Sequence, residues 1–242
     1  MSKSIPQSYS LGNKGVIIAL TVIVLWFTSL IFLLNTEMSW SNPLTYLGIL
    51  VQMHLYTGLF ITAHDAMHGI VSPNKKVNHA IGWISAILFS YNFYWKLFPK
   101  HHEHHRFVAT DKDPDYHASG NFFRWYLSFL LQYVTIWQIL LMAGTFNILK
   151  LFLPTENLIA FWMIPAILST LQLFYFGTFL PHMGNAHNRH HSYSQSKNHL
   201  WAFFSCYFFG YHYEHHDSPG TPWWNLWKVK EEYTKSGKPS ND

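Results

Sequence analysis

Long apolar runs separated by short polar links set the pattern of this chain. Residues 15–34 carry no charged side chain, and residues 44–63 form a second uncharged run that continues directly into His64. Residues 122–147 and 157–180 form two further runs, and Pro165 in the last one is expected to kink its helix unless neighbours relieve it. Because a helix needs about 20 apolar residues to cross a bilayer, the pattern predicts four spanning helices.

The remaining apolar segments do not have the length or composition of a span. Residues 79–98 are apolar and aromatic but contain polar breaks at Ser85, Ser90 and Asn92, which favours a re-entrant or interfacial segment. Residues 200–211 are too short to cross. We expect a single all-α membrane domain over residues 1–242, with flexible ends at residues 1–14 and 228–242.

Composition agrees with a membrane protein. Only 12% of the 242 residues are charged, against about 25% in soluble domains. The net charge of +4 comes without a patch rich in Lys and Arg, so we expect no nucleic-acid partner. Cys206 is the only cysteine, which excludes an internal disulfide and a cysteine-ligated iron–sulfur cluster.

Histidine clusters carry the chemistry. Residues 100–106 read Lys-His-His-Glu-His-His-Arg, and His101, His104 and His105 stand at i, i+3 and i+4, on one face of a helix. The same spacing occurs near the C-terminus, at His212, His215 and His216. Neutral imidazole is a good ligand for iron, copper, zinc or nickel, and a cation removes the cost of gathering unpaired rings. The spacing therefore predicts a metal protein.

His64 and His68, at i and i+4 where the second run ends, raise the number of candidate ligands to eight. One ion takes about three or four protein ligands, so eight histidines suggest two ions with four or five imidazoles each. His182 after the fourth run is a ninth candidate. His190 is a tenth, and His187 or His191 of the same loop could take its place. Packed, hydrogen-bonded or solvated side chains are expected for His54, His79, His102, His117 and His199.

Acidic residues accompany each cluster. Asp65, Glu103 and Glu214 hold matching places in the three clusters, where they could accept the second N–H of a ligating ring or lie on a solvated helix face. Asp113 and Asp115 follow the second cluster. Their string is either a bare turn or a segment that orients histidine rings and binds a donor protein.

Charge also predicts the orientation of the chain. If the N-terminus is cytoplasmic, four spans place every histidine cluster on the cytoplasmic side, together with most Lys and Arg residues. The two links on the opposite side carry only Glu37, Lys150 and Glu156 as charged residues.

Three histidine clusters on a small membrane protein resemble the membrane fatty acid desaturase and hydroxylase superfamily. Longer strings narrow the resemblance to the bacterial-type β-carotene ketolases. These strings are Phe-Ile-Thr-Ala-His-Asp-Ala-Met-His-Gly at 60–69, Asp-Pro-Asp at 113–115, Phe-Gly-Thr-Phe-Leu-Pro-His at 176–182, and Gly-Tyr-His-Tyr-Glu-His-His at 210–216 with Pro-Trp-Trp at 222–224.

The resemblance implies a histidine-rich centre of two iron ions that uses O2 and electrons from a ferredoxin or similar donor. It implies oxidation of the C4 methylene of each β-ionone ring, from β-carotene through echinenone to canthaxanthin. Two hydroxylations at one carbon give a gem-diol, which loses water to form the ketone. The apolar substrate would enter from the membrane lipid through a cleft lined by aromatic side chains.

Two alternatives stay open at this point. The histidine clusters alone do not exclude an acyl-chain desaturase or hydroxylase of the same superfamily. A membrane metal transporter is more remote, because its ligands would lie near the bilayer midplane, whereas these clusters lie at span ends and in loops.

Overall fold

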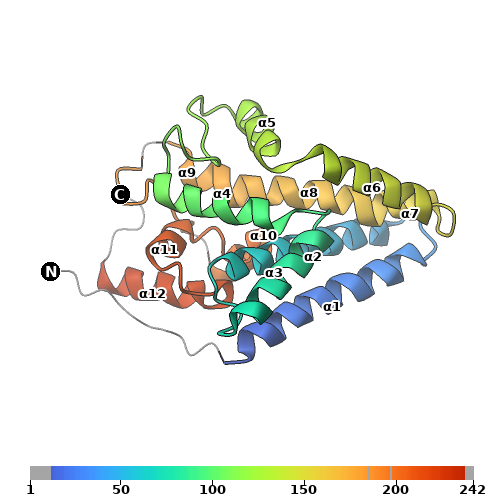
Figure 1. Ribbon diagram of the computed structural model, residues 1–242, viewed down its shortest axis with the longest axis horizontal. Helices are drawn as coiled ribbons and strands as arrows, with labels where there is room; N and C mark the ends of the chain where they lie inside the picture. Colours follow the sequence, from blue (N-terminus) through green and yellow to red (C-terminus); the bar gives the residue numbers. More distant parts are fainter. Residues whose placement is uncertain (1–11, 185, 197, 238–242) are drawn as a thin grey trace.

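The protein is described here from a computed structural model that covers residues 12–184, 186–196 and 198–237 (Figure 1). These residues form helices joined by loops, and no strand occurs among them. The all-α class predicted from the apolar runs is confirmed.

Three helices are long and apolar enough to cross a membrane. The first two are α1 (Lys14–Leu34) and α2 (Pro43–Met67), and α2 starts with Pro43 in its first turn and the Asn42 side chain accepting the Leu44 N–H. The third runs over Thr155–His182. Its five parts are α7 (Thr155–Leu158), η1 (Ile159–Met163), α8 (Ile164–Leu173), η2 (Phe174–Phe179) and α9 (Leu180–His182).

Both prolines of this third helix follow a π-helical segment. Pro165 lies in the first turn of α8 after η1, and Pro181 lies in the first turn of α9 after η2. A proline lacks the N–H that an α-helix interior requires, and wider π turns accommodate that loss. The expected disturbance at Pro165 is therefore relieved within the helix.

The predicted span over 122–147 is divided into two helices. Helices α5 (Phe122–Tyr133) and α6 (Ile136–Leu149) meet at 82°, so they form either a broken span or a re-entrant loop. Thr135 and Gln138 form a capping box that starts α6 as a new helix. Gln138 also donates to Asn92 Oδ1 at 2.7 Å, which fixes the bend against the segment before α4. The number of candidate spans is three, or four if this pair counts as one.

The shorter helices surround the ends of the long ones. Residues 79–98 contribute to α3 (Lys75–Leu88) and α4 (Tyr94–Phe107), and neither is long enough to span. The C-terminal part contains α10 (His199–Cys206), α11 (His212–Asp217), η3 (Trp223–Asn225) and α12 (Leu226–Ser236). Part of the predicted flexible end at 228–242 lies in α12, in which Val229 and Tyr233 are buried. The predicted flexible ends at 1–11 and 238–242 lie outside the described residues.

The long helices bury one face and expose another apolar face. In α1, Val22 and Trp26 join the core with Tyr56 of α2, whereas Phe27 and Phe32 are more than half exposed. An apolar surface of this kind suits lipid, where exposed side chains gain nothing from charge. Figure 1 shows α4, α9, α11 and α12 at one end of the bundle and the α1–α2 and α6–α7 links at the other.

Candidate metal centre

Nine histidines from four separate segments meet at the end of the bundle. They come from the C-terminal end of α2, from α4, from α9 and from α11. The structure divides them into two groups, and within each group the ligand atoms all lie within 4.8 Å of one another. The five-histidine group consists of His64, His68, His101, His105 and His215, and the four-histidine group of His104, His182, His212 and His216.

The two groups share helices in a way that the spacing alone did not indicate. From α4, His101 and His105 enter the five-histidine group, whereas His104 enters the other. From α11 the division is reversed, and only His215 joins the five-histidine group. Each i, i+3, i+4 set therefore lies on one face of its helix but is divided between the two groups. Residues at i+3 and i+4 point about 100° apart, so each helix lies between two sites and serves both.

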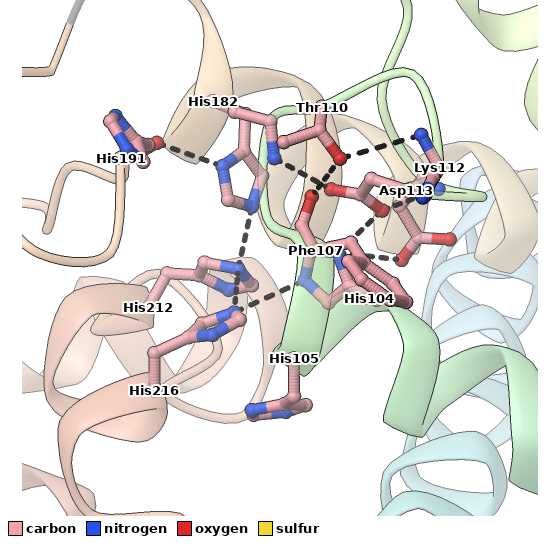
Figure 2. Close-up of polar contacts among 12 residues, drawn as sticks. His104, His105, Phe107, Thr110, Lys112, Asp113, His182, His191, His212 and His216 are labelled. Carbon is pink, nitrogen blue, oxygen red and sulfur yellow. Dashed lines mark hydrogen bonds and ion pairs between the residues drawn. The ribbon is translucent and has the colours of Figure 1, made fainter.

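The four-histidine group is closely packed and fully buried (Figure 2). Its Nε2 atoms approach one another: His104 to His216 at 3.1 Å, His216 to His212 at 2.9 Å, and His212 to His182 at 2.9 Å. In the five-histidine group, His101 and His68 approach at 2.6 Å through Nε2, and His105 and His215 at 3.0 Å.

Two rings of the four-histidine group have acceptors on their outer nitrogen. His104 Nδ1 donates to Asp113 Oδ1 at 2.9 Å, and His182 Nδ1 donates to the carbonyl oxygen of His191 at 3.0 Å (Figure 2). Asp113 is itself fixed by the backbone N–H of Ala109 and of Asp115, each at 2.9 Å. These acceptors place the proton on Nδ1 and leave the Nε2 lone pair for a cation.

Asp65 and Asp115 lie close to the histidines in other ways. Asp65 Oδ1 is 3.5 Å from His64 Nδ1, and its Oδ2 accepts the backbone N–H of Trp223 at 3.1 Å. Asp115 Oδ2 is 3.9 Å from His104 Nδ1, while its Oδ1 accepts the hydroxyl of Tyr133.

The two glutamates do not contact histidine rings. Glu103 is exposed. Glu214 is buried, and its carboxylate accepts Lys230 Nζ at 3.1 Å and the hydroxyl of Ser194. This buried pair ties α11 to α12, so Glu214 supports the helix that carries three of the histidines.

His190 lies outside both groups. Its Nε2 is 3.1 Å from Asp217 Oδ1 at the end of α11. His187 and His191 are exposed, and His191 contributes to the site only through its carbonyl oxygen. The five histidines that were expected to pack or bond do so: His54 stacks on Tyr207, and His79, His102, His117 and His199 have hydrogen-bond partners on neighbouring residues.

Burial keeps most of these rings neutral. Burial and neighbouring imidazoles lower the pKa of His68 to about 3 and that of His105 to about 2, and they lower the pKa of His101 well below its usual range. His104 differs, because Asp115 and Asp113 raise its pKa despite burial. Neutral imidazole is the form that binds metal.

The geometry fits bound metal ions. Two cis ligands at about 2.1 Å from an octahedral ion have nitrogens about 3.0 Å apart, and most of the Nε2 separations are 2.9 to 3.1 Å. His182 has its proton on Nδ1, so its Nε2 lone pair is directed at His212 Nε2 and is available to a cation. Each group could hold one ion.

An apolar cavity lies next to a smaller chamber that the histidines line. The outer cavity, of about 630 Å³, lies between α5, α6 and the Thr155–His182 helix. A smaller inner chamber of about 50 Å³ reaches His64, His101, His105 and His215 of the five-histidine group and His104 and His212 of the other. Five residues line both spaces, namely Phe60, Leu97, Phe129, Tyr133 and Leu173.

Tyr133 and Thr178 line the inner chamber, and neither was a candidate from the sequence. Thr178 carried a usable signal, because it precedes His182 by four residues and so shares its helix face. Tyr133 carried none, because only the fold brings the end of α5 to Asp115.

Comparison with known proteins identifies the class. A family model described as fatty acid desaturase matches residues 39–151 and 130–240. The chain belongs to the fatty acid desaturase family. No solved structure matches it.

Named relatives are more specific. The chain is 35% identical to zeaxanthin 4-ketolase of Chlamydomonas reinhardtii over 93% of its length, and it spans 55% of that protein. It is 34% identical to β-carotene 4-ketolase 3 of Haematococcus lacustris, over 88% of this chain and 78% of the relative. It is 40% identical to a β-carotene ketolase of Paracoccus sp. (strain PC1), over 73% and 75% respectively.

Proposed function

We propose that this protein is a β-carotene 4-ketolase, which oxidises the C4 methylene of β-ionone rings to a ketone, from β-carotene through echinenone to canthaxanthin. The observation that carries the proposal is the apolar cavity that shares five wall residues with the chamber at the histidine groups. The relatives named as carotenoid ketolases support the choice of substrate.

The outer cavity suits a long apolar polyene. Its wall is formed by side chains such as Phe89, Phe146, Ile159 and Met163, with few polar groups among them. Burial of a hydrocarbon against such a wall is favourable without specific polar contacts. The ring at the end of the polyene would then lie at the residues shared by the two spaces, with C4 directed to the histidines.

The nine histidines of the two groups are the proposed ligands of two iron ions, with Asp113 orienting His104, and Asp65 and Asp115 close by. Bound iron would supply the redox chemistry that side chains lack for breaking an allylic C–H bond with O2. Each of two hydroxylations at C4 consumes O2, two electrons and two protons and releases water. The resulting gem-diol loses a further water to become the ketone. The residues of the chamber hold the ring and exclude competing reactants.

Electrons would come from a ferredoxin or a similar reduced protein. We place the histidine end of the bundle on the cytoplasmic side, where such donors occur. The charge distribution supports this orientation, because the links at the far end carry only Glu37, Lys150 and Glu156, whereas most Lys and Arg residues lie toward the histidine end.

Pigment analysis of a bacterial host that accumulates β-carotene tests the proposal, with and without this chain. We expect conversion to echinenone and canthaxanthin. The control is His212→Ala at matched abundance in the membrane, which should leave β-carotene unchanged. If the intact protein is present and β-carotene and hydroxylated carotenoids both remain unoxidised, the proposal is rejected.

An acyl-lipid desaturase or hydroxylase is the second candidate, because the family match and an apolar cavity also suit an acyl chain. Lipid analysis of the same host separates the two, since new double bonds or hydroxyl groups in its acyl chains would favour this reading. A metal transporter is disfavoured because the histidine groups lie at the end of the bundle (Figure 1).

A further inference from the structure

The wall of the inner chamber contains three polar side chains that belong to neither histidine group. These are Asp115, Tyr133 and Thr178, and the other members of the wall are apolar or are histidines of the two groups. Asp115 and Tyr133 bond to each other. The Thr178 hydroxyl forms no hydrogen bond with any residue that the structure describes. Thr178 is only 5% exposed.

Thr178 lies on the same helix as one histidine of the four-histidine group. It lies in η2, four residues before His182, so the two side chains stand on the same face of one helix. Its neighbour Gly177 leaves room for Phe209, because a Cβ at Gly177 would lie 3.0 Å from that ring. Phe209 in turn stacks on His215 with ring centroids 5.6 Å apart. Thr178 therefore lies in the wall of the chamber that six of the histidines also line.

A threonine in a helix commonly bonds to a carbonyl oxygen one turn earlier. On the same helix, Ser169 and Thr170 both bond to the carbonyl oxygen of Ala166, whereas Thr178 makes no such bond among the described residues. Because Thr178 lines the inner chamber, its hydroxyl can bind a polar group of a ligand that enters the chamber. β-Carotene is a hydrocarbon and offers none. The first hydroxylation creates one at C4.

We propose that Thr178 is a positioning residue that binds the C4 hydroxyl formed by the first hydroxylation. The alcohol O–H donates to Thr178 Oγ1, which retains the half-oxidised ring and keeps the remaining C4 hydrogen directed at the histidine centre. The second hydroxylation replaces that hydrogen with a hydroxyl, using O2, two electrons and two protons and releasing water. The gem-diol then loses water to give the ketone. This inference rests on the proposed function.

The test is the ratio of 4-hydroxy to 4-keto products in a host that accumulates β-carotene. Thr178→Val keeps the shape but cannot accept the hydrogen bond, so we expect the ratio to rise about tenfold, as loss of one hydrogen bond predicts. Thr178→Ser should restore the wild-type ratio. Ser169→Ala is the matched control, because it removes a buried hydroxyl from the same helix outside both cavities and should leave the ratio unchanged.

Failure of this inference differs from failure of the proposed function. If wild type makes ketone and Thr178→Val makes it with an unchanged ratio, Thr178 does not hold the alcohol. The inference is also overturned if Thr178→Val lowers protein abundance and both products together, with no change in ratio. If wild type makes neither product, the proposed function itself fails.

Discussion

The two histidine groups differ in how the protein supports them. The four-histidine group is wholly buried, and two of its rings bond outward to Asp113 and to the carbonyl of His191. In the five-histidine group three rings are only half-buried. Apart from the 3.5 Å approach of Asp65 to His64, the described residues give its rings no polar partner other than another histidine of the group.

The five-histidine group contributes more rings to the wall of the inner chamber. Four rings of the five-histidine group line that chamber, against two of the four-histidine group. We therefore expect the four-histidine group to hold its ion rigidly and the five-histidine group to face the substrate. The centre would then combine one rigidly held ion with a second ion whose site stays open to the substrate.

The largest effect should follow removal of a ligand from either group. His212→Ala and His215→Ala change the same helix on its two sides, and each should reduce ketone formation by more than about 100-fold, since even outer partners of ligands are worth about 10–100-fold. Bound iron, measured by elemental analysis of purified protein, should fall in both. The same outcome is expected for His101→Ala, His105→Ala and His216→Ala.

His102→Ala is the matched control for these variants, because its ring lies on α4 but is exposed and bonds to Phe98. It should keep wild-type iron. Full activity in His212→Ala or His215→Ala would remove that residue from the ligand set.

The next effect concerns the outer support of the four-histidine group. Asp113→Asn replaces the carboxylate that fixes His104 with a weaker acceptor, so iron affinity should fall by about 10–100-fold. Competition with a chelator measures this affinity. Asp111→Asn removes an exposed charge from the same loop and should have no effect. Equal iron affinity in both variants would show that the bond from His104 to Asp113 does not strengthen iron binding by the four-histidine group.

Asp65→Asn should have a smaller effect, because Asp65 is 3.5 Å from His64 and its other oxygen accepts the Trp223 N–H. We expect turnover to fall about tenfold, the lower end for an outer partner of a ligand, with little loss of protein abundance. Rates of ketone formation normalised to membrane abundance decide this. Parallel loss of rate and abundance would instead assign Asp65 a folding role.

The features that could be predicted from the sequence are those fixed by local structure. The histidine spacings predicted candidate ligands because i, i+3 and i+4 positions are fixed by helix geometry. Their division between two groups depends on how α4 and α11 face each other, which spacing does not encode. The bend after Tyr133 did leave a local signal, since Thr135 and Gln138 have the pattern of a capping box before an apolar run. The inner chamber left none, because its wall joins residues from α2, α4, α5, η2 and α11.

The smallest effect on the metal centre is expected for His190→Ala. His190 was a candidate ligand, but its ring contacts Asp217 and lies outside both groups. Removing it should leave iron content and ketone formation within about twofold of wild type. Loss of the contact with Asp217 should lower the free energy of unfolding by about 1–2 kcal/mol, a typical value for a hydrogen bond to a charged group.

Thermal unfolding of the detergent-solubilised protein measures that loss, and His187→Ala, at an exposed position of the same loop, is its control. Iron loss in His190→Ala comparable to that in His212→Ala would add His190 to the four-histidine group, whose His216 ring is 5.8 Å away. The two groups would then hold five histidines each, and the contrast between them would rest on burial and outward bonds alone.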